Sequence, residues 1–101
     1  MKVHSFDIKD AEEFGVNCAI ILFYLRFWLQ KNKANQKNIH NGYYWTYNSI
    51  SAYLELFPYL SRKSINTALS KLENLGIIQT GFFNSSKYDR TKWYTIIDEF
   101  K

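Results

Sequence analysis

The segment from Ser61 to Gly76 constrains the fold most, because it has the local features of a complete surface helix. Apolar residues recur at helical spacing, at positions 65, 68, 69, 72 and 75. Ser61 is a residue type that caps helix N-termini, and Gly76 is the residue type that ends helices. We therefore expect a helix over about 62–75 with one apolar face and one polar face.

Three helices are expected before this segment. Asp7 is placed to cap a short helix over Ile8–Phe14, and Gly15 to stop it. Asn17 is then expected to cap a longer helix from Cys18 to about Lys31.

A polar segment over 32–42 ends in the turn dipeptide Asn41-Gly42, and the aromatic run 43–47 reads as a short strand. Asn48 is expected to cap a third helix over about 49–56, which Pro58 ends because the residue before a proline disfavours helix.

The expected helix at 62–75 is followed by a strand over 77–83, a polar loop over 84–90 and a returning strand over 91–97. The resulting order is helix, helix, strand, helix, helix, strand, loop, strand. We expect an α+β fold, mainly α, in which about four helices accompany a small three-stranded antiparallel sheet. Residues 1–101 would form a single winged helix-turn-helix domain, with the recognition helix at about 62–75 and the wing at about 84–90.

The composition limits the classes of partner. Residues 1–30 carry three Lys and Arg against four Asp and Glu, whereas residues 31–101 carry ten against five. A basic C-terminal two-thirds suits a polyanionic partner, although an ordinary solvated surface would explain the charge equally well. Aromatic residues make up 19% of the chain, which is more than so short a chain can bury, so part of this surface is expected to face a partner.

The location expected from the sequence is the cytoplasm. The single cysteine, Cys18, excludes an intrachain disulfide and lies in an apolar run typical of a buried, inert thiol. That run is too short to span a bilayer and ends at Arg26, and the acidic N-terminal segment lacks a signal-peptide pattern.

The helix expected over 18–31 is apolar nearly all round. Ile21, Leu25 and Trp28 lie on one side, and Ile20, Tyr24 and Phe27 lie beside them. Such a helix is either enclosed within one chain or shared with a partner, and a homodimer through this helix is one hypothesis.

The polar face of the helix at 62–75 is the predicted contact surface for double-stranded DNA. Hydroxyl, amide and cationic side chains can bond base edges and phosphates, and Glu73 is expected nearer the edge of the core. A solvated face of an ordinary surface helix is the alternative. The predicted contacts on this helix and its cap are Ser61, Arg62, Lys63, Ser64, Asn66, Thr67, Ser70, Lys71 and Asn74.

The loop adds a second set of predicted contacts, in which Lys87 and Arg90 would meet the flanking backbone or the minor groove. Asp89 is expected to pair with Arg90 or Lys92 and to set the hairpin, and Trp93 is expected in the core. The predicted contacts here are Ser85, Ser86, Lys87, Tyr88, Arg90 and Lys92.

Catalysis finds little support in the sequence. His4, His40 and Cys18 lack metal-ligand spacing, and we find no phosphate loop, serine elbow or paired carboxylates. No catalytic residue, metal or cofactor is therefore expected. The aromatic residues could stack on single-stranded bases, but their periodicity favours the core.

Several blocks of the chain resemble the N-terminal DNA-binding domains of phage and prophage replication initiators (replisome organisers) and related helix-turn-helix proteins. These blocks are 14–22 with 28–29, 41–49, 57–61, 68–69, 72–73, 75–78, 81–84 and 88–94, the last being Tyr-Asp-Arg-Thr-Lys-Trp-Tyr. The resemblance implies a winged-helix fold, DNA binding through 61–74 and 84–92, and a location in the cytoplasm of a bacterial host cell. Replication initiators usually continue into a second domain that recruits helicase machinery. A chain ending at Lys101 would be part of a longer protein, a small repressor, or a domain reused to bind a protein.

Two functions from different classes therefore remain open. The first is a phage or prophage protein that binds double-stranded DNA as a transcriptional regulator or replication-origin binder. The second is a phage-encoded inhibitor that binds a host protein or a defence complex such as a CRISPR effector. Reversing the charge of Lys63 and Lys71 would abolish DNA binding and spare an interface built on the helix at 18–31.

Overall fold

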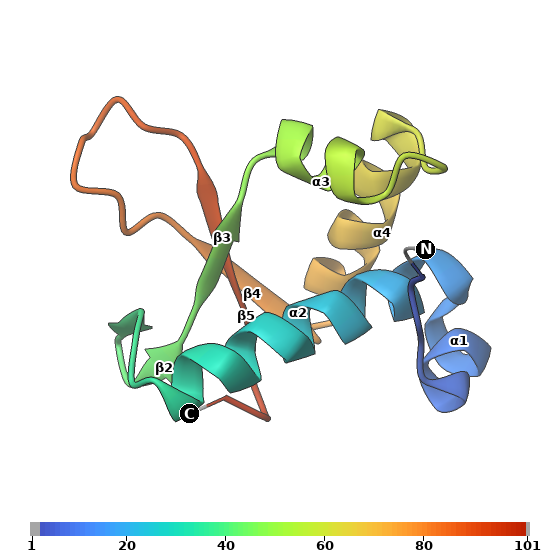
Figure 1. Cartoon of the computed structure of the whole chain (residues 1–101), viewed down its shortest axis with the longest axis horizontal. Helices are drawn as coiled ribbons and strands as arrows, with labels where there is room; N and C mark the ends of the chain where they lie inside the picture. Colours follow the sequence, from blue (N-terminus) through green and yellow to red (C-terminus); the bar gives the residue numbers. More distant parts are fainter. Residues whose placement is uncertain (1–2, 101) are drawn as a thin grey trace.

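The computed structural model describes residues 3–100, which form four helices and two small antiparallel sheets (Figure 1). The structure confirms the expected α+β class, the four helices and the three-stranded antiparallel sheet. The two-stranded sheet was not expected. In chain order the elements are α1 (Ile8–Phe14), α2 (Val16–Ala34), β1 (Ile39–His40), β2 (Tyr43–Tyr44), β3 (Thr46–Asn48), α3 (Ile50–Leu56), α4 (Arg62–Asn74), β4 (Ile78–Gly81) and β5 (Lys92–Ile96).

The helices α1 and α4 begin at the caps that their sequences predict. The Asp7 carboxylate accepts a hydrogen bond from the backbone N–H of Asp10, and the Ser61 hydroxyl accepts one from Ser64. Helix α4 ends at Asn74, one residue earlier than expected, and Gly76 follows with a positive φ of 74°. The predicted boundaries of α1 and α4 are therefore correct to within one residue.

Two predicted caps are wrong. Helix α2 begins at Val16 because Gly15, with φ 94°, ends α1 and is also the N-cap of α2, so Asn17 already lies inside the helix. Helix α2 also runs three residues past Lys31, to Ala34. Helix α3 is capped by Ser49, whose hydroxyl accepts from the Ala52 N–H at 3.1 Å, and the Asn48 amide instead donates to the Tyr24 hydroxyl.

The strand expected over 43–47 is divided at Trp45. Its backbone N–H donates to the carbonyl of Asn38 and its own carbonyl accepts from the buried Asn32 amide, so neither group is free for a ladder. Tyr43–Tyr44 instead pairs with Ile39–His40 across the Asn41-Gly42 turn, in which both residues have positive φ. This hairpin is the two-stranded sheet that the sequence analysis did not expect.

The three-stranded sheet has the order β3-β5-β4, and both pairings are antiparallel. Tyr47 pairs with Trp93 in β5, and Trp93 pairs with Gly81 on its other side. The loop between β4 and β5 covers residues 82–91, longer than the expected 84–90 because both strands are shorter than predicted. In Figure 1 this loop extends away from the helices.

Helix α2 lies at the centre of the molecule, where it packs against α1, α4 and β5. Its buried side includes Ile21, Leu22, Leu25 and Leu29, which join apolar residues from α3, α4 and the sheet. Trp93 is buried, as expected. Within residues 3–100, no helix is both long and apolar enough to cross a bilayer.

Candidate functional site

Helix α4 presents a polar ridge to solvent. Its apolar side, formed by Ile65, Ala68, Leu69 and Leu72, is buried, which fixes the rotation of the helix. The opposite side consists of exposed residues, as its sequence predicts: Lys63, Thr67, Ser70 and Asn74. Each of these side chains is therefore accessible to a ligand.

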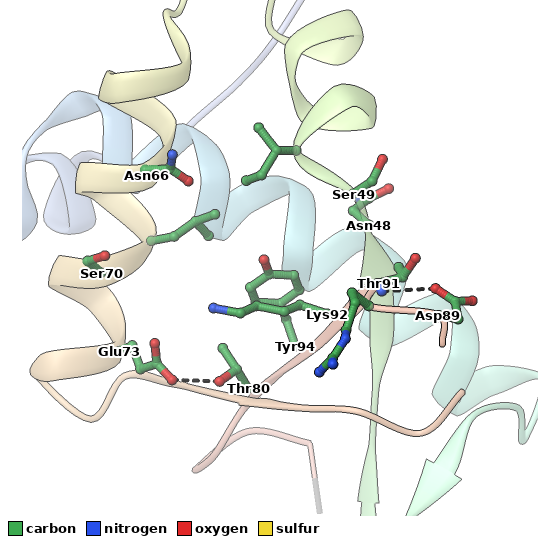
Figure 2. Close-up of a pocket in the computed structure, with 13 residues that line it drawn as sticks. Asn48, Ser49, Asn66, Ser70, Glu73, Thr80, Asp89, Thr91, Lys92 and Tyr94 are labelled. Atoms are coloured by element: carbon green, nitrogen blue, oxygen red, sulfur yellow. Dashed lines mark hydrogen bonds between the residues drawn. The ribbon is translucent and has the colours of Figure 1, made fainter. Parts of the chain in front are cut away.

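A hollow of about 460 Å³ lies on one side of this ridge, between α4 and strand β5. Figure 2 shows Asn66 and Ser70 on α4, facing Asn48 and Ser49 across the hollow, with Lys92 and Tyr94 between them. Arg90 also lines it. Four predicted contact residues therefore meet here: Asn66, Ser70, Arg90 and Lys92. Asn48 and Ser49 were missed, because no local signal in the sequence links the end of β3 to α4.

This hollow is of mixed charge, which the sequence analysis did not expect. Glu73 lines it beside Arg90 and Lys92, and its carboxylate accepts a 2.6 Å hydrogen bond from the Thr80 hydroxyl. Glu73 was expected nearer the edge of the core; its side chain is exposed and contacts the sheet through Thr80. Glu73 lies seven residues after Asn66, and this spacing returns to the same side of a helix. The sequence could therefore have shown that the two side chains share one side of α4.

The base of the β4–β5 loop is held by Asn84. Its amide donates to the carbonyls of Asp89, at 3.0 Å, and Thr91, at 2.9 Å. Its side-chain oxygen accepts from the Trp93 indole at 2.7 Å. One side chain therefore ties together both ends of the loop and anchors them to the buried Trp93.

Asp89 sets the hairpin in a different way from the one expected. Among the described residues it forms no ion pair with Arg90 or Lys92; its carboxylate accepts from the Thr91 backbone N–H at 2.9 Å. Hydrogen bonds from Thr91, first of all from its backbone, lower the pKa of Asp89. Arg90 and Lys92 are consequently exposed and free of this carboxylate.

The rest of the loop is exposed, including the predicted contacts Ser85, Ser86 and Lys87. Tyr88 is 80% exposed, and the Lys87 ammonium lies over its ring at 5.4 Å from the centroid. An aromatic side chain so exposed, beside a cation, offers both an apolar and an ionic contact to a partner.

A second hollow lies on the other side of the ridge, where α4 meets the junction of α1 and α2. Lys63, Thr67 and Lys71 line it. The Lys71 ammonium donates to the Phe14 carbonyl at 2.9 Å, which satisfies an acceptor at the end of α1. Ser64 is half-buried here, and its hydroxyl accepts a hydrogen bond from the exposed Ser61, so Ser64 is the least accessible of the predicted contacts.

Arg62 lines neither hollow, whereas Cys18 lies at the second hollow without a reactive neighbour. Arg62 is exposed at the start of α4, and Cys18 is buried, with its thiol against the Ala68 carbonyl. Burial raises the pKa of Cys18, which disfavours the thiolate. Across residues 3–100, no three His, Cys, Asp or Glu side chains gather to hold a metal ion.

Comparison of the chain with protein-family models, curated proteins and solved structures finds no significant match. The resemblance to phage replication initiators stays a prediction, and the surface of α4 and the β4–β5 loop is the best indication of function.

Proposed function

We propose that this protein binds double-stranded DNA as a winged-helix domain, with α4 as the recognition helix and the β4–β5 loop as the wing. The element order supports this proposal: two helices joined by a short turn, α3 and α4, precede a β-hairpin, and one further strand, β3, completes the sheet. A phage or prophage protein acting as a transcriptional regulator or a replication-origin binder would need such a domain.

The distribution of charge is the observation that carries the proposal. Helix α4 and the segment 82–92 together contain six of the thirteen Lys and Arg residues and two of the nine Asp and Glu residues. The rest of the chain contains seven of each and is neutral, so the net charge of +4 belongs entirely to these two segments. A polyanion would therefore be attracted to this side of the protein.

The shape of the surface also suits a duplex. Helix α4 has 13 residues, a length of about 20 Å at 1.5 Å per residue, and a B-DNA major groove is wide enough to admit a helix. With the α4 ridge in that groove, the hollows on its two sides face the two phosphate backbones. Lys63 and Lys71 would then neutralise one backbone, and Arg90 and Lys92 the other.

The test is binding to a random-sequence duplex across a salt series. We expect the affinity to fall steeply with salt, with a slope of about −0.9 for each phosphate neutralised. Lys63→Glu with Lys71→Glu should abolish binding, while Lys33→Glu with Lys37→Glu, which makes the same charge change at exposed residues elsewhere, should reduce it only slightly. Glu73→Gln retains an acceptor for Thr80, removes a carboxylate from the hollow, and should strengthen binding.

Since Lys71 also bonds the end of α1, Lys63→Glu alone is a second variant that leaves this contact intact. Thermal unfolding of each variant verifies that the fold is retained. No binding by the original protein at low salt would overturn the proposal. Equal losses in the two charge-reversal pairs would show attraction by net charge and would overturn the assignment to α4.

A second candidate function is favoured by the exposed aromatic side chains of α2. Phe23 and Phe27 are 44% and 55% exposed, and an inhibitor of a host protein or defence complex could use them as contacts. This function predicts that Lys63→Glu with Lys71→Glu leaves inhibition of the target intact, whereas Phe27→Glu removes it.

A further inference from the structure

The outward side of α2 carries an apolar seam, formed by Val16, Ile20, Phe23 and Phe27. These residues follow one another at intervals of four, three and four, the spacing at which one side of a helix packs against another helix. Val16 is 49% exposed and both phenylalanines are also exposed, whereas Ile20 is buried together with seven residues on the other sides of the helix. The seam is therefore an apolar surface that the described part of the chain leaves largely uncovered.

The chain itself covers a small part of this seam. Val3 and His4, in the segment before α1, lie beside Ile20, which is almost fully buried, and His4 is held by a 2.7 Å hydrogen bond to the Tyr59 hydroxyl. These three residues also line a hollow of about 340 Å³, whose mainly aromatic walls include Phe23, Phe27 and Trp28. The side chain of a partner helix could enter this hollow.

The two ends of α2 differ in charge. Glu12 and Glu13 are exposed near the end of α1, shortly before the first residue of α2. Lys31 and Lys33 lie in its last turn, and Lys31 is held over the Trp28 ring. A partner that fits this surface would present an apolar seam with a basic group at one end and an acidic group at the other.

A second copy of this chain in the opposite direction has these properties. We propose that the protein forms a twofold dimer in which α2 packs antiparallel against α2 along the Val16–Phe27 seam. Phe27 of each copy then lies over the buried Ile20 of the other copy and its neighbours Val3 and His4, and Phe23 lies near the twofold axis. Lys31 of each copy approaches Glu12 and Glu13 of the other, whereas a parallel pair would place like charges together.

The small size of the seam sets the strength of this dimer. Two half-exposed phenylalanines and their neighbours bury an area near the lower limit for specific interfaces, about 1,000 Å² in total. We therefore expect a dimer that dissociates on dilution, with roughly micromolar affinity. The α4 surface is not part of this contact, so the dimer does not depend on the proposed DNA binding.

The test is the mass of the protein in solution as a function of concentration, by sedimentation equilibrium. The original protein should shift from monomer to dimer as its concentration rises, and Phe27→Glu should weaken the dimer at least tenfold. Phe82→Glu is the matched control, because Phe82 is 56% exposed on the β4–β5 loop and Phe27 is 55% exposed. A monomer at every concentration overturns the proposal and leaves the seam to a different partner. A dimer weakened equally by both substitutions also overturns it.

Cysteine cross-linking tests the orientation of the helices. Phe23→Cys, near the axis, should form a disulfide-linked dimer under mild oxidation. Gln30→Cys should not, because Gln30 lies near the opposite end of α2 from its counterpart. The buried Cys18 provides an unreactive background. Faster cross-linking through Gln30→Cys would show a parallel arrangement and would overturn the antiparallel one.

Discussion

Replacing Asn84 with alanine should destabilise the protein by about 3 kcal/mol. Three hydrogen bonds are lost, of which the one to Asp89 is exposed and those to Thr91 and Trp93 are partly buried. The two bonds to carbonyls are worth about 0.5–1.5 kcal/mol each, and the Trp93 indole N–H, left without a partner, costs about 1–3 kcal/mol. The sum is a large share of the 5–15 kcal/mol that stabilises a typical domain.

Urea unfolding followed by circular dichroism measures this loss directly, and thermal unfolding should show a fall in Tm of roughly 12–24 °C. Ser86→Ala is the matched control in the same loop, because the Ser86 hydroxyl accepts only one exposed hydrogen bond, at 3.3 Å, from the Tyr88 N–H. We expect that control to lie within about 0.5 kcal/mol of the original protein.

The same substitution should weaken DNA binding under conditions where the variant is still folded, because Asn84 fixes the loop that carries Arg90. A stability for Asn84→Ala indistinguishable from that of Ser86→Ala would refute the view that Asn84 holds the loop. If Asn84→Ala lowers stability but leaves the DNA affinity unchanged, the β4–β5 loop does not contribute to DNA binding.

Two further predictions concern the buried tyrosines. Among the described residues the Tyr53 hydroxyl is buried without a hydrogen-bond partner, so Tyr53→Phe should leave the free energy of unfolding unchanged or raise it by about 1 kcal/mol. Tyr24→Phe, which removes the acceptor for the Asn48 amide, should instead lower the free energy of unfolding. If urea unfolding shows Tyr53→Phe to be less stable than Tyr24→Phe, this reasoning is contradicted. Burial raises the pKa of Tyr94 to about 12 from an ordinary value near 10, so the neutral phenol is favoured in the folded protein. The contribution of Tyr94 to stability should therefore be complete below pH 10 and be lost, by about 2–3 kcal/mol, as the pH rises from 10 to 12, because the unfolded chain ionises first. Tyr94→Phe should flatten this fall, measured by urea unfolding at pH 9 and pH 11, and an equally steep fall in the variant would exclude Tyr94 as its source.

Local sequence determined most of the helices and the accessibility of the α4 surface. Asp7 and Ser61 bond N–H groups three residues away, so their effect is complete within one helical turn and is visible in the sequence. The apolar residues at positions 65, 68, 69 and 72 are all buried, which orients the ridge of Lys63, Thr67, Ser70 and Asn74 outward. Periodicity alone is sufficient here because a helix has a single rotation that buries its apolar side.

Tertiary structure decided what lies beside that ridge. The mixed charge of the hollow depends on the sheet register, which brings Thr80 and Lys92 close to Glu73, and strand pairing joins residues far apart in the chain. The break at Trp45 has the same origin, since its backbone groups bond Asn38 and Asn32, outside the sheet.

The sequence of α2 likewise showed that the helix is apolar nearly all round, but it did not show which side stays exposed. That side is selected by what packs on the others: α1, α4 and β5 cover three sides of the helix and leave Phe23 and Phe27 accessible. Hydrophobic burial is non-directional, so an apolar helix can be packed in several rotations, and only its neighbours in space determine which one forms.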